Sequence, residues 1–368
     1  MENFIVSARK YRPQTFDSVV GQSAITTTLK NSILKDQIGQ AFLFCGPRGV
    51  GKTTCARIFA KTINCTNRTP EGEACNECES CRSFAASASF NIFELDAASN
   101  NGVDHIRTLV DQVKVPPSGV QYKVYIIDEV HMLSQSAFNA FLKTLEEPPA
   151  YAKFILATTE KHKILPTILS RCQIFDFKRI GVKDIISHLE GIAQKENIKY
   201  ELDALNIIAQ KADGGLRDAL SMFDQMVSFS DGNLTYNNVI ENLNILDYDY
   251  FFQMVDFFIN NNMADALLLY NTITEKGFEG SNFLAGLNDH LRNLSICKNS
   301  KTLPLLSLSD NIKQKYQEQA EKFTAKQLVD LLTLFTQYEY QYKNIPNKRL
   351  HVEVALMRAC NINKVRQS

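Results

Sequence analysis

An apolar run, a glycine-rich turn and a helical pattern follow one another between residues 41 and 63, and this order limits the possible folds most strongly. Residues 41–45 are apolar, residues 46–53 read Gly-Pro-Arg-Gly-Val-Gly-Lys-Thr, and residues 54–63 are helical in pattern. This spacing predicts a phosphate-binding loop when it lies between a strand and a helix, and that context is present. The disfavoured alternative is a glycine-rich turn before an ordinary helix. The chain is therefore expected to contain an α/β domain built around the loop.

The residue types in this turn suit the binding of phosphate groups. Gly49 and Gly51 allow the backbone N–H groups to point inward, and the helix N-terminus adds its positive dipole end. Lys52 is expected to reach the β- and γ-phosphates, and the Thr53 hydroxyl is expected to ligate Mg²⁺. The predicted nucleotide-binding residues of the loop are Gly46, Pro47, Arg48, Gly49, Val50, Gly51, Lys52, Thr53 and Thr54.

A later apolar run, residues 122–129, ends in two acidic residues, Asp128 and Glu129. A near-continuous apolar strand is what a parallel sheet buried on both faces requires. Acids at the carboxyl end of such a strand lie where α/β sheets bind ligands. Asp128 suits the Mg²⁺ shell, and Glu129 suits orienting and deprotonating an attacking water. An acidic strand end without function is the alternative interpretation.

Strand and helix patterns alternate from residue 41 to residue 177, which predicts a parallel sheet between helices. The expected strands cover residues 41–45, 91–96, 122–129, 153–159 and 173–177. Thr158 and Thr159 would place hydroxyls near the γ-phosphate if the fourth strand neighbours the third. After Gly181 the patterns are helical and no further strand is expected. Apolar stripes predict a helical bundle core from Phe251, Met254, Val255 and Phe258 and from Leu328, Leu331, Leu332 and Phe335.

Four of the nine cysteines have metal-ligand spacing: Cys65, Cys75, Cys78 and Cys81. Four thiolates make a closed tetrahedral Zn²⁺ site, whose role is structural because no coordination position stays open. An iron–sulfur cluster uses similar ligands and is the less favoured alternative, since nothing else in the chain suggests redox chemistry. The other five cysteines are expected to be simple thiols: Cys45, Cys55, Cys172, Cys297 and Cys360.

The 368 residues carry 40 basic and 40 acidic side chains, so the net charge gives no indication of a nucleic-acid partner. Any DNA contact is expected from a local face or from helix N-termini. No basic segment followed by an apolar core opens the chain, and no apolar run approaches the ~18–20 residues of a membrane helix. Together with an odd cysteine number, this predicts a cytoplasmic protein of two to three domains with no membrane partner.

Two other places in the chain are candidates for nucleotide contacts. Tyr11, Arg12 and Val20 could form a wall on the adenine side, although an N-terminal strap over the core is equally compatible with their composition. Arg217 lies in the first turn of a helical pattern, where the helix dipole disfavours a cation, and this suggests an anion nearby. A surface arginine paired with Asp218 is the stronger interpretation of that feature alone.

Taken together, these features resemble the AAA+ ATPases and, within them, the gamma/tau family of clamp-loader subunits of bacterial DNA polymerase III. The resemblance covers about residues 5–361 and is strongest over the first 230. It rests on the phosphate loop, the four cysteines and the segments at residues 8–16, 124–133, 143–149, 156–160, 170–172, 215–220 and 349–358.

The resemblance implies an AAA+ phosphate-loop ATPase domain at residues 1–179 with a zinc module at 65–81. A helical lid at 180–242 and a helical collar at 243–368, which joins subunits in a ring, would follow. It also implies that Thr158 and Arg217 sense the γ-phosphate and that Arg171 acts in trans as an arginine finger in a neighbouring subunit's site. The implied cofactors are ATP/ADP, Mg²⁺ and Zn²⁺. The implied work is ATP-driven loading of the sliding clamp onto primer-template DNA, together with the delta and delta prime subunits and other copies of this chain.

Three other functions compete with this one. An inert scaffold relative, such as delta prime, shares the zinc module and Ser170-Arg171-Cys172, but the intact Lys52 and Glu129 argue against it. An assembly hub would bind ATP without turnover, so hydrolysis separates it from a motor. A nucleotide kinase is a distant third, because it has no use for the helices after residue 230.

Overall fold

The computed structural model describes residues 5–243, 245–306, 308 and 310–362. It contains two compact units. The first unit consists of Met1–Asn197 and Ile208–Gln225, and the second consists of Ile198–Ile207 and Met226–Ser368. Each unit has its own buried core.

The first unit is built on a five-stranded parallel sheet in the order β2-β3-β4-β1-β5. The expected α/β architecture is therefore confirmed. Because β4 pairs with both β1 and β3, the phosphate loop after β1 and the acids after β3 flank the end of β4. The strands are β1 (Ala41–Cys45), β2 (Ile92–Asp96), β3 (Lys123–Asp128), β4 (Ala152–Thr158) and β5 (Gln173–Asp176).

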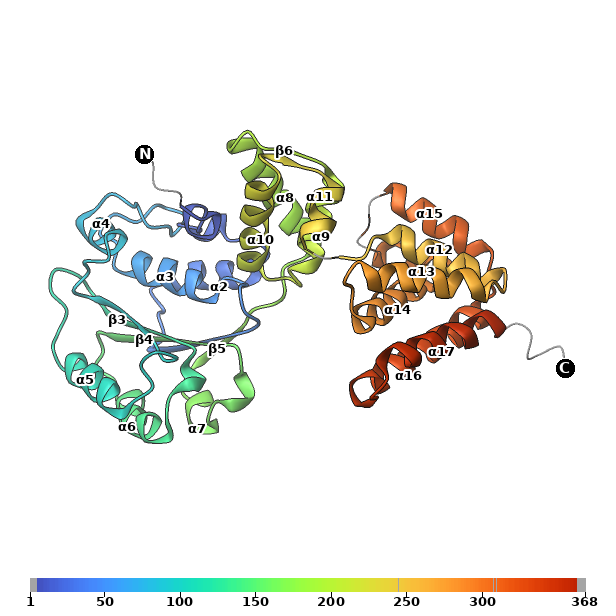
Figure 1. Cartoon of the computed structure of the whole chain (residues 1–368). Helices are drawn as coiled ribbons and strands as arrows, with labels where there is room; N and C mark the ends of the chain where they lie inside the picture. Colours follow the sequence, from blue (N-terminus) through green and yellow to red (C-terminus); the bar gives the residue numbers. More distant parts are fainter. Residues whose placement is uncertain (1–4, 244, 307, 309, 363–368) are drawn as a thin grey trace. The chain divides into compact units, whose positions relative to one another are not determined.

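Helices cover both faces of this sheet (Figure 1). Side chains alternate along each strand, so Phe42 and Phe44 belong to one core and Leu43 to the other. The first core packs under α2 (Ser23–Leu34) and α3 (Lys52–Ile63). The second packs under α5 (Val103–Val113), α6 (Gln135–Glu146) and α7 (Pro166–Leu169). The shorter elements are α1 (Ser7–Lys10), α4 (Glu79–Ala85) and the 3-10 turns Phe16–Ser18, Val130–Met132 and Lys161–Lys163.

Four helices follow the sheet: α8 (Val182–Lys195), α9 (Leu202–Lys211), α10 (Leu216–Phe229) and α11 (Tyr236–Asn242). The expectation that no strand follows Gly181 is wrong. Two-residue strands β6 (Lys199–Tyr200) and β7 (Asn233–Leu234) pair in parallel. Two residues are too few to display a strand period, which is why the sequence pattern missed them.

The second unit contains a helical bundle around one apolar core. The two apolar stripes lie in this core as expected: Phe251, Met254, Val255 and Phe258 are buried, as are Leu328, Leu331 and Phe335, while Leu332 packs against them half-buried. None of the helices in the described part of the chain has the length and apolar character to cross a membrane. The bundle helices are α12 (Tyr248–Ile259), α13 (Met263–Glu275), α14 (Gly280–Cys297), α15 (Asp310–Glu321), α16 (Ala325–Gln341) and α17 (Lys348–Asn361), with 3-10 turns at Ser300–Leu305 and Tyr342–Asn344.

Candidate functional site

Two glycines fix the course of the loop between β1 and α3. A Cβ at Gly46 would lie 2.5 Å from the carbonyl oxygen of Phe177, so no larger residue fits there without moving backbone. Gly51 is the N-cap of α3 with φ 102°, a left-handed conformation that favours glycine. The strand therefore turns directly into the helix N-terminus, where unpaired N–H groups suit an anion.

Lys52 folds back over this loop. Its side chain is buried, and Nζ donates to the carbonyl oxygens of Gly46 at 2.8 Å and Pro47 at 2.7 Å. Burial lowers the pKa of Lys52, while the nearby carboxylates of Glu129 and Asp128 act in the opposite direction. The ammonium is thus held at the loop, where phosphate oxygens are its natural partners.

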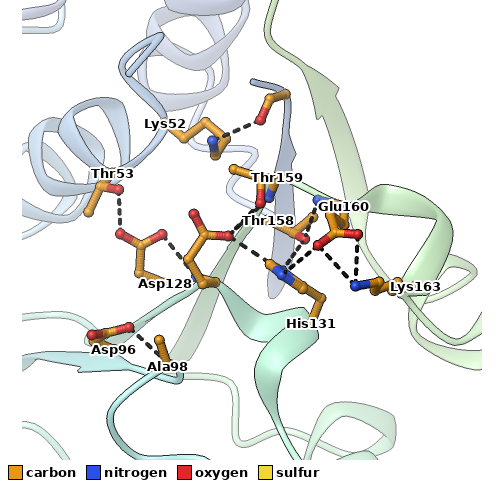
Figure 2. A network of polar contacts seen from close by, with 12 residues as sticks. Lys52, Thr53, Asp96, Ala98, Asp128, His131, Thr158, Thr159, Glu160 and Lys163 are labelled. Atoms are coloured by element: carbon orange, nitrogen blue, oxygen red, sulfur yellow. Dashed lines mark hydrogen bonds and ion pairs between the residues drawn. The ribbon is translucent and has the colours of Figure 1, made fainter. Parts of the chain in front are cut away.

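Thr53 and Asp128 meet across the site, although 75 residues separate them. The Thr53 hydroxyl donates to Asp128 Oδ2 at 2.6 Å, and Asp128 Oδ1 accepts the N–H of Glu129 at 3.0 Å (Figure 2). A hydroxyl and a carboxylate are the hard oxygen ligands that Mg²⁺ prefers, with water and phosphate completing its shell. This pair therefore fits the predicted magnesium ligands.

Glu129 is held by the end of the neighbouring strand. Its φ of 46° is left-handed, and Oε2 accepts both the N–H of Thr159 at 3.1 Å and the Thr159 hydroxyl at 2.9 Å. Sequence reasoning placed hydroxyls at this strand end but did not assign Thr159 to Glu129. The contact depends on β3 and β4 being neighbours, which no local pattern encodes.

Thr158 and His131 form a second polar contact at the same edge (Figure 2). Thr158 is fully buried, and its Oγ1 lies 3.0 Å from His131 Nδ1. The N–H of Glu160 donates to the same oxygen at 3.0 Å. His131 also faces Glu129 Oε2 at 3.4 Å and Glu160 Oε1 at 3.3 Å. Sequence reasoning missed His131, because a lone histidine two residues after Glu129 has no distinguishing spacing.

Part of the expected adenine wall contacts the loop helix. Arg12 Nε donates to the Thr54 hydroxyl at 3.2 Å. Burial lowers the pKa of Arg12, and the charge of Arg57 adds to that effect. Tyr11 instead bonds Glu196, the C-cap of α8, and Val20 is half-buried. A hollow of about 430 Å³ lies between this segment and α8, lined by Tyr11, Arg12 and His188 among others.

The first turn of α10 packs on the phosphate loop. The backbone N–H of Arg217 donates to the Gly49 carbonyl at 3.3 Å, while its side chain is exposed. Gln22, which sequence reasoning missed, supports the loop from the other side by donating to the carbonyls of Val50 at 3.4 Å and Lys178 at 2.7 Å. Buried amide bridges of this kind have no sequence signature.

Arg171 forms hydrogen bonds with residues outside the phosphate loop of its own chain. It is exposed after α7, and its guanidinium donates to Glu146 Oε1 at 2.8 Å and to the Thr167 carbonyl at 2.6 Å. Within the described residues, none of its hydrogen bonds reaches the loop. The side chain is therefore presented at the surface.

The four spaced cysteines come together in the structure. Their sulfur atoms all lie within 4.8 Å of one another, with Cys65 Sγ at 3.5 Å from Cys75 Sγ and 3.9 Å from Cys78 Sγ. A tetrahedral zinc with bonds of about 2.3 Å requires sulfur separations of about 3.8 Å, so the cluster fits the metal. The N–H groups of Glu77 and Cys78 point at Cys75 Sγ and lower its pKa, which favours the thiolate that binds metal.

Three family models match the chain in succession. "DNA polymerase III, delta subunit" matches residues 21–181, and "DNA polymerase III clamp loader subunit, ATPase lid domain" matches residues 184–232. "DNA polymerase III subunits gamma and tau domain III" matches residues 234–367. The solved structure of the Thermotoga maritima RuvB Holliday junction branch migration motor aligns with 68% of this chain and 79% of its own, at 20% identity and a TM-score of 0.48.

Several curated relatives cover nearly all of this chain. DNA polymerase III subunit tau of Bacillus subtilis is 42% identical over 352 residues, or 96% of this chain and 62% of the relative. Subunit gamma of Buchnera aphidicola subsp. Baizongia pistaciae is 37% identical over 98% of both chains. Subunit tau of Escherichia coli is 39% identical over 97% of this chain and 55% of the relative. The chain thus spans little more than half the length of the two tau subunits.

Proposed function

Because this chain belongs to the family of DNA polymerase III subunits gamma and tau, we propose that it is the ATP-hydrolysing motor subunit of a clamp loader. Hydrolysis would drive the loading of a ring-shaped sliding clamp onto primed DNA. The observation that carries the proposal is the 2.6 Å contact between Thr53 Oγ1 and Asp128 Oδ2. It joins the phosphate loop to the acidic strand end, where a phosphoryl-transfer site needs its magnesium ligands.

Each side chain of the site has a part in this reaction. Lys52 and the loop N–H groups bind the β- and γ-phosphates. Thr53 and Asp128 would hold Mg²⁺, whose charge neutralises the phosphate oxygens when it is bound. Glu129 orients a water and accepts its proton, and Thr158 donates to the γ-phosphate. Arg217 contacts the same phosphate from α10, and Arg171 completes the site of a neighbouring subunit.

The proposal extends to the remaining parts of the chain. Residues 1–179 form the ATPase domain with its zinc module, residues 180–242 the lid, and residues 243–368 the collar that holds subunits together. Tyr11, Arg12 and Val20 form the adenine side of the site, supported by the Arg12 contact with Thr54. The partners are delta, delta prime, further copies of this chain, the sliding clamp and primer-template DNA, all in the cytoplasm where replication takes place.

The first test is the replacement of Lys52. We expect Lys52→Ala to lower steady-state ATP hydrolysis at least about a hundredfold, because loss of a positioned charge on the transferred phosphate costs about 3 kcal/mol. Turnover is measured for this chain alone and then with delta, delta prime, sliding clamp and primed DNA added. Lys35→Ala is the matched control, since Lys35 is an exposed lysine after α2.

The results separate a motor from a scaffold. Low turnover alone, strong stimulation on assembly and loss in Lys52→Ala support the motor. Nucleotide binding without hydrolysis in every mixture would instead assign the chain to a scaffold that uses ATP for assembly.

A further inference from the structure

His131 occupies the centre of the polar network at the end of β4, and the proposed mechanism gives it no part. It lies in the short turn Val130–Met132 directly after Glu129. Its side chain is only 5% exposed, and both ring nitrogens face protein oxygens (Figure 2). A buried ring held at both ends by polar partners has a fixed orientation, which a residue needs if it is to position another group.

The hydrogen bonds of Thr158 show what His131 can control. A hydroxyl has one proton to donate and two lone pairs that accept. One lone pair of Thr158 Oγ1 already accepts the N–H of Glu160 at 3.0 Å. If His131 Nδ1 lacks a proton, the Thr158 hydroxyl must donate to it at 3.0 Å and cannot donate elsewhere. If Nδ1 carries a proton, it fills the second lone pair and the hydroxyl proton becomes free.

The surroundings of the ring favour the proton on Nδ1. This nitrogen also lies 3.4 Å from Glu129 Oε2, and a bare lone pair facing a carboxylate oxygen is repulsive. The opposite nitrogen, Nε2, faces Glu160 Oε1 at 3.3 Å, but Glu160 already has a cationic partner in Lys163 at 2.9 Å. Glu129 Oε2 is bonded by the neutral donors of Thr159. An N–H on Nδ1 therefore stabilises the Glu129 carboxylate more than an N–H on Nε2 would stabilise Glu160.

We propose that His131 is a positioning residue that keeps its Nδ1 proton on Thr158 Oγ1 and thereby leaves the Thr158 hydroxyl free to donate to the terminal phosphate. The same N–H edge faces Glu129, so one ring links the phosphate-sensing hydroxyl to the residue that activates water. This inference rests on the proposed ATPase function, because it concerns a donor that matters only when a phosphate is transferred.

An asparagine–glutamine pair at position 131 tests the role. The side-chain nitrogen of asparagine lies as many bonds from Cα as His131 Nδ1, whereas that of glutamine lies as far as Nε2. We expect His131→Asn to keep turnover of the assembled protein within about threefold of wild type. His131→Gln and His131→Leu should lower kcat about ten- to a hundredfold, as expected for a transition-state donor that is no longer held in orientation, with unchanged nucleotide Kd.

Two controls separate positioning from folding. His162→Leu should have no effect, because the His162 side chain is 77% exposed and, among the described residues, is paired with Glu160 alone. Thr158→Val should lose at least as much kcat as His131→Leu, and the double variant should be no worse than Thr158→Val, since His131 acts by orienting the hydroxyl that the valine removes. Equal turnover of the asparagine and glutamine variants, or multiplied losses in the double variant, would overturn the inference.

A spectroscopic measurement tests the proton itself without nucleotide. In protein labelled with ¹⁵N-histidine, the two ring nitrogens of each of the six histidines report whether they carry hydrogen, and His131→Asn identifies the signals of His131. We expect Nδ1 to be protonated, and a bare Nδ1 would refute the inference. If wild type lacks turnover in every mixture, the ATPase proposal fails instead, whereas an active wild type with a dead Lys52→Ala and fully active His131 variants refutes only the positioning role.

Discussion

At the scale of single residues, burial sets the chemistry of the polar side chains. Lys52 is buried but donates to two carbonyl oxygens, so its charge has partners. His290 of α14 is 1% exposed between Phe252 and Tyr316, and its Nε2 lies 2.9 Å from Gln319 Oε1. Burial lowers the pKa of His290 to about 4, while Gln319 and Asp256 act in the opposite direction.

This shift predicts that the second unit loses stability in mild acid. The unfolded chain binds a proton at His290 near pH 6.5, while the folded protein does so only near pH 4. The folded protein is therefore most stable above pH 6.5, where His290 is neutral in both the folded and the unfolded chain. As the pH falls to 4, the unfolding free energy drops by about 3 kcal/mol because only the unfolded chain takes up the proton. Calorimetric melting between pH 7.5 and 4 measures it.

The comparison variant for this prediction is His290→Gln, which has no group that titrates in this range. Its melting transition should depend less on pH than that of wild type. His162→Gln, at an exposed histidine, should keep the wild-type pH dependence. An identical pH dependence in wild type and His290→Gln would contradict the assignment.

At the scale of structural elements, the cysteine cluster supports a segment that reaches the nucleotide site. Glu73, inside the module, accepts the N–H groups of Phe16 at 3.0 Å and Asp17 at 3.2 Å. The same N-terminal segment contains Arg12, which contacts Thr54. The metal module, the N-terminal segment and the first turns of α3 are thus joined by consecutive contacts.

We therefore predict that removing zinc weakens nucleotide binding without touching the phosphate loop. The protein should contain one zinc per chain by elemental analysis, and Cys78→Ser should lose it, because three thiolates no longer close the tetrahedron. ATP affinity of Cys78→Ser should fall about three- to tenfold, or roughly 1 kcal/mol, because the N-terminal segment that contains Arg12 loses its support from Glu73. Cys297→Ser is the control, since Cys297 lies in α14 outside the cluster. Iron in the purified protein, or full zinc content in Cys78→Ser, would exclude this site.

At the scale of the whole molecule, the exposed Arg171 predicts that catalysis requires a neighbour. Arg171→Ala should bind ATP as wild type does, but assembled turnover should fall about a thousandfold, the usual effect of losing an arginine finger. Arg107→Ala is the matched control, because Arg107 is an exposed arginine paired with Asp104 on its own helix. Nucleotide titration and steady-state hydrolysis measure the two quantities.

Assemblies that mix two inactive variants test directly whether Arg171 acts in the site of a neighbouring subunit. A Lys52→Ala subunit lacks turnover but still presents Arg171, and an Arg171→Ala subunit has an intact loop. In equal mixtures, random pairing gives about a quarter of the sites both an intact loop and a neighbouring arginine. Turnover should therefore return to about a quarter of the wild-type value. Mixtures as inactive as the separate variants would show that Arg171 does not act in trans.

Local patterns were sufficient for most of the architecture. The expected strands at residues 41–45 and 91–96 agree with β1 and β2 to within a residue. The spacing of apolar residues in a strand or helix depends on which of its faces is buried, and this spacing can be seen in the sequence itself. The two-residue strands β6 and β7 were not predicted, because so short a pairing depends on the residues that surround it in the fold.

The amino-acid sequence by itself determined the phosphate loop, the acidic end of β3 and the four-cysteine spacing, since each depends on residues close together in the chain. Only the tertiary structure decided which side chains meet. The strand order places β4 beside β3, so Thr159 bonds Glu129 and Thr158 faces His131. Gln22 likewise reaches Lys178 across 156 residues. Such contacts follow from the packing of distant elements, which no local spacing contains.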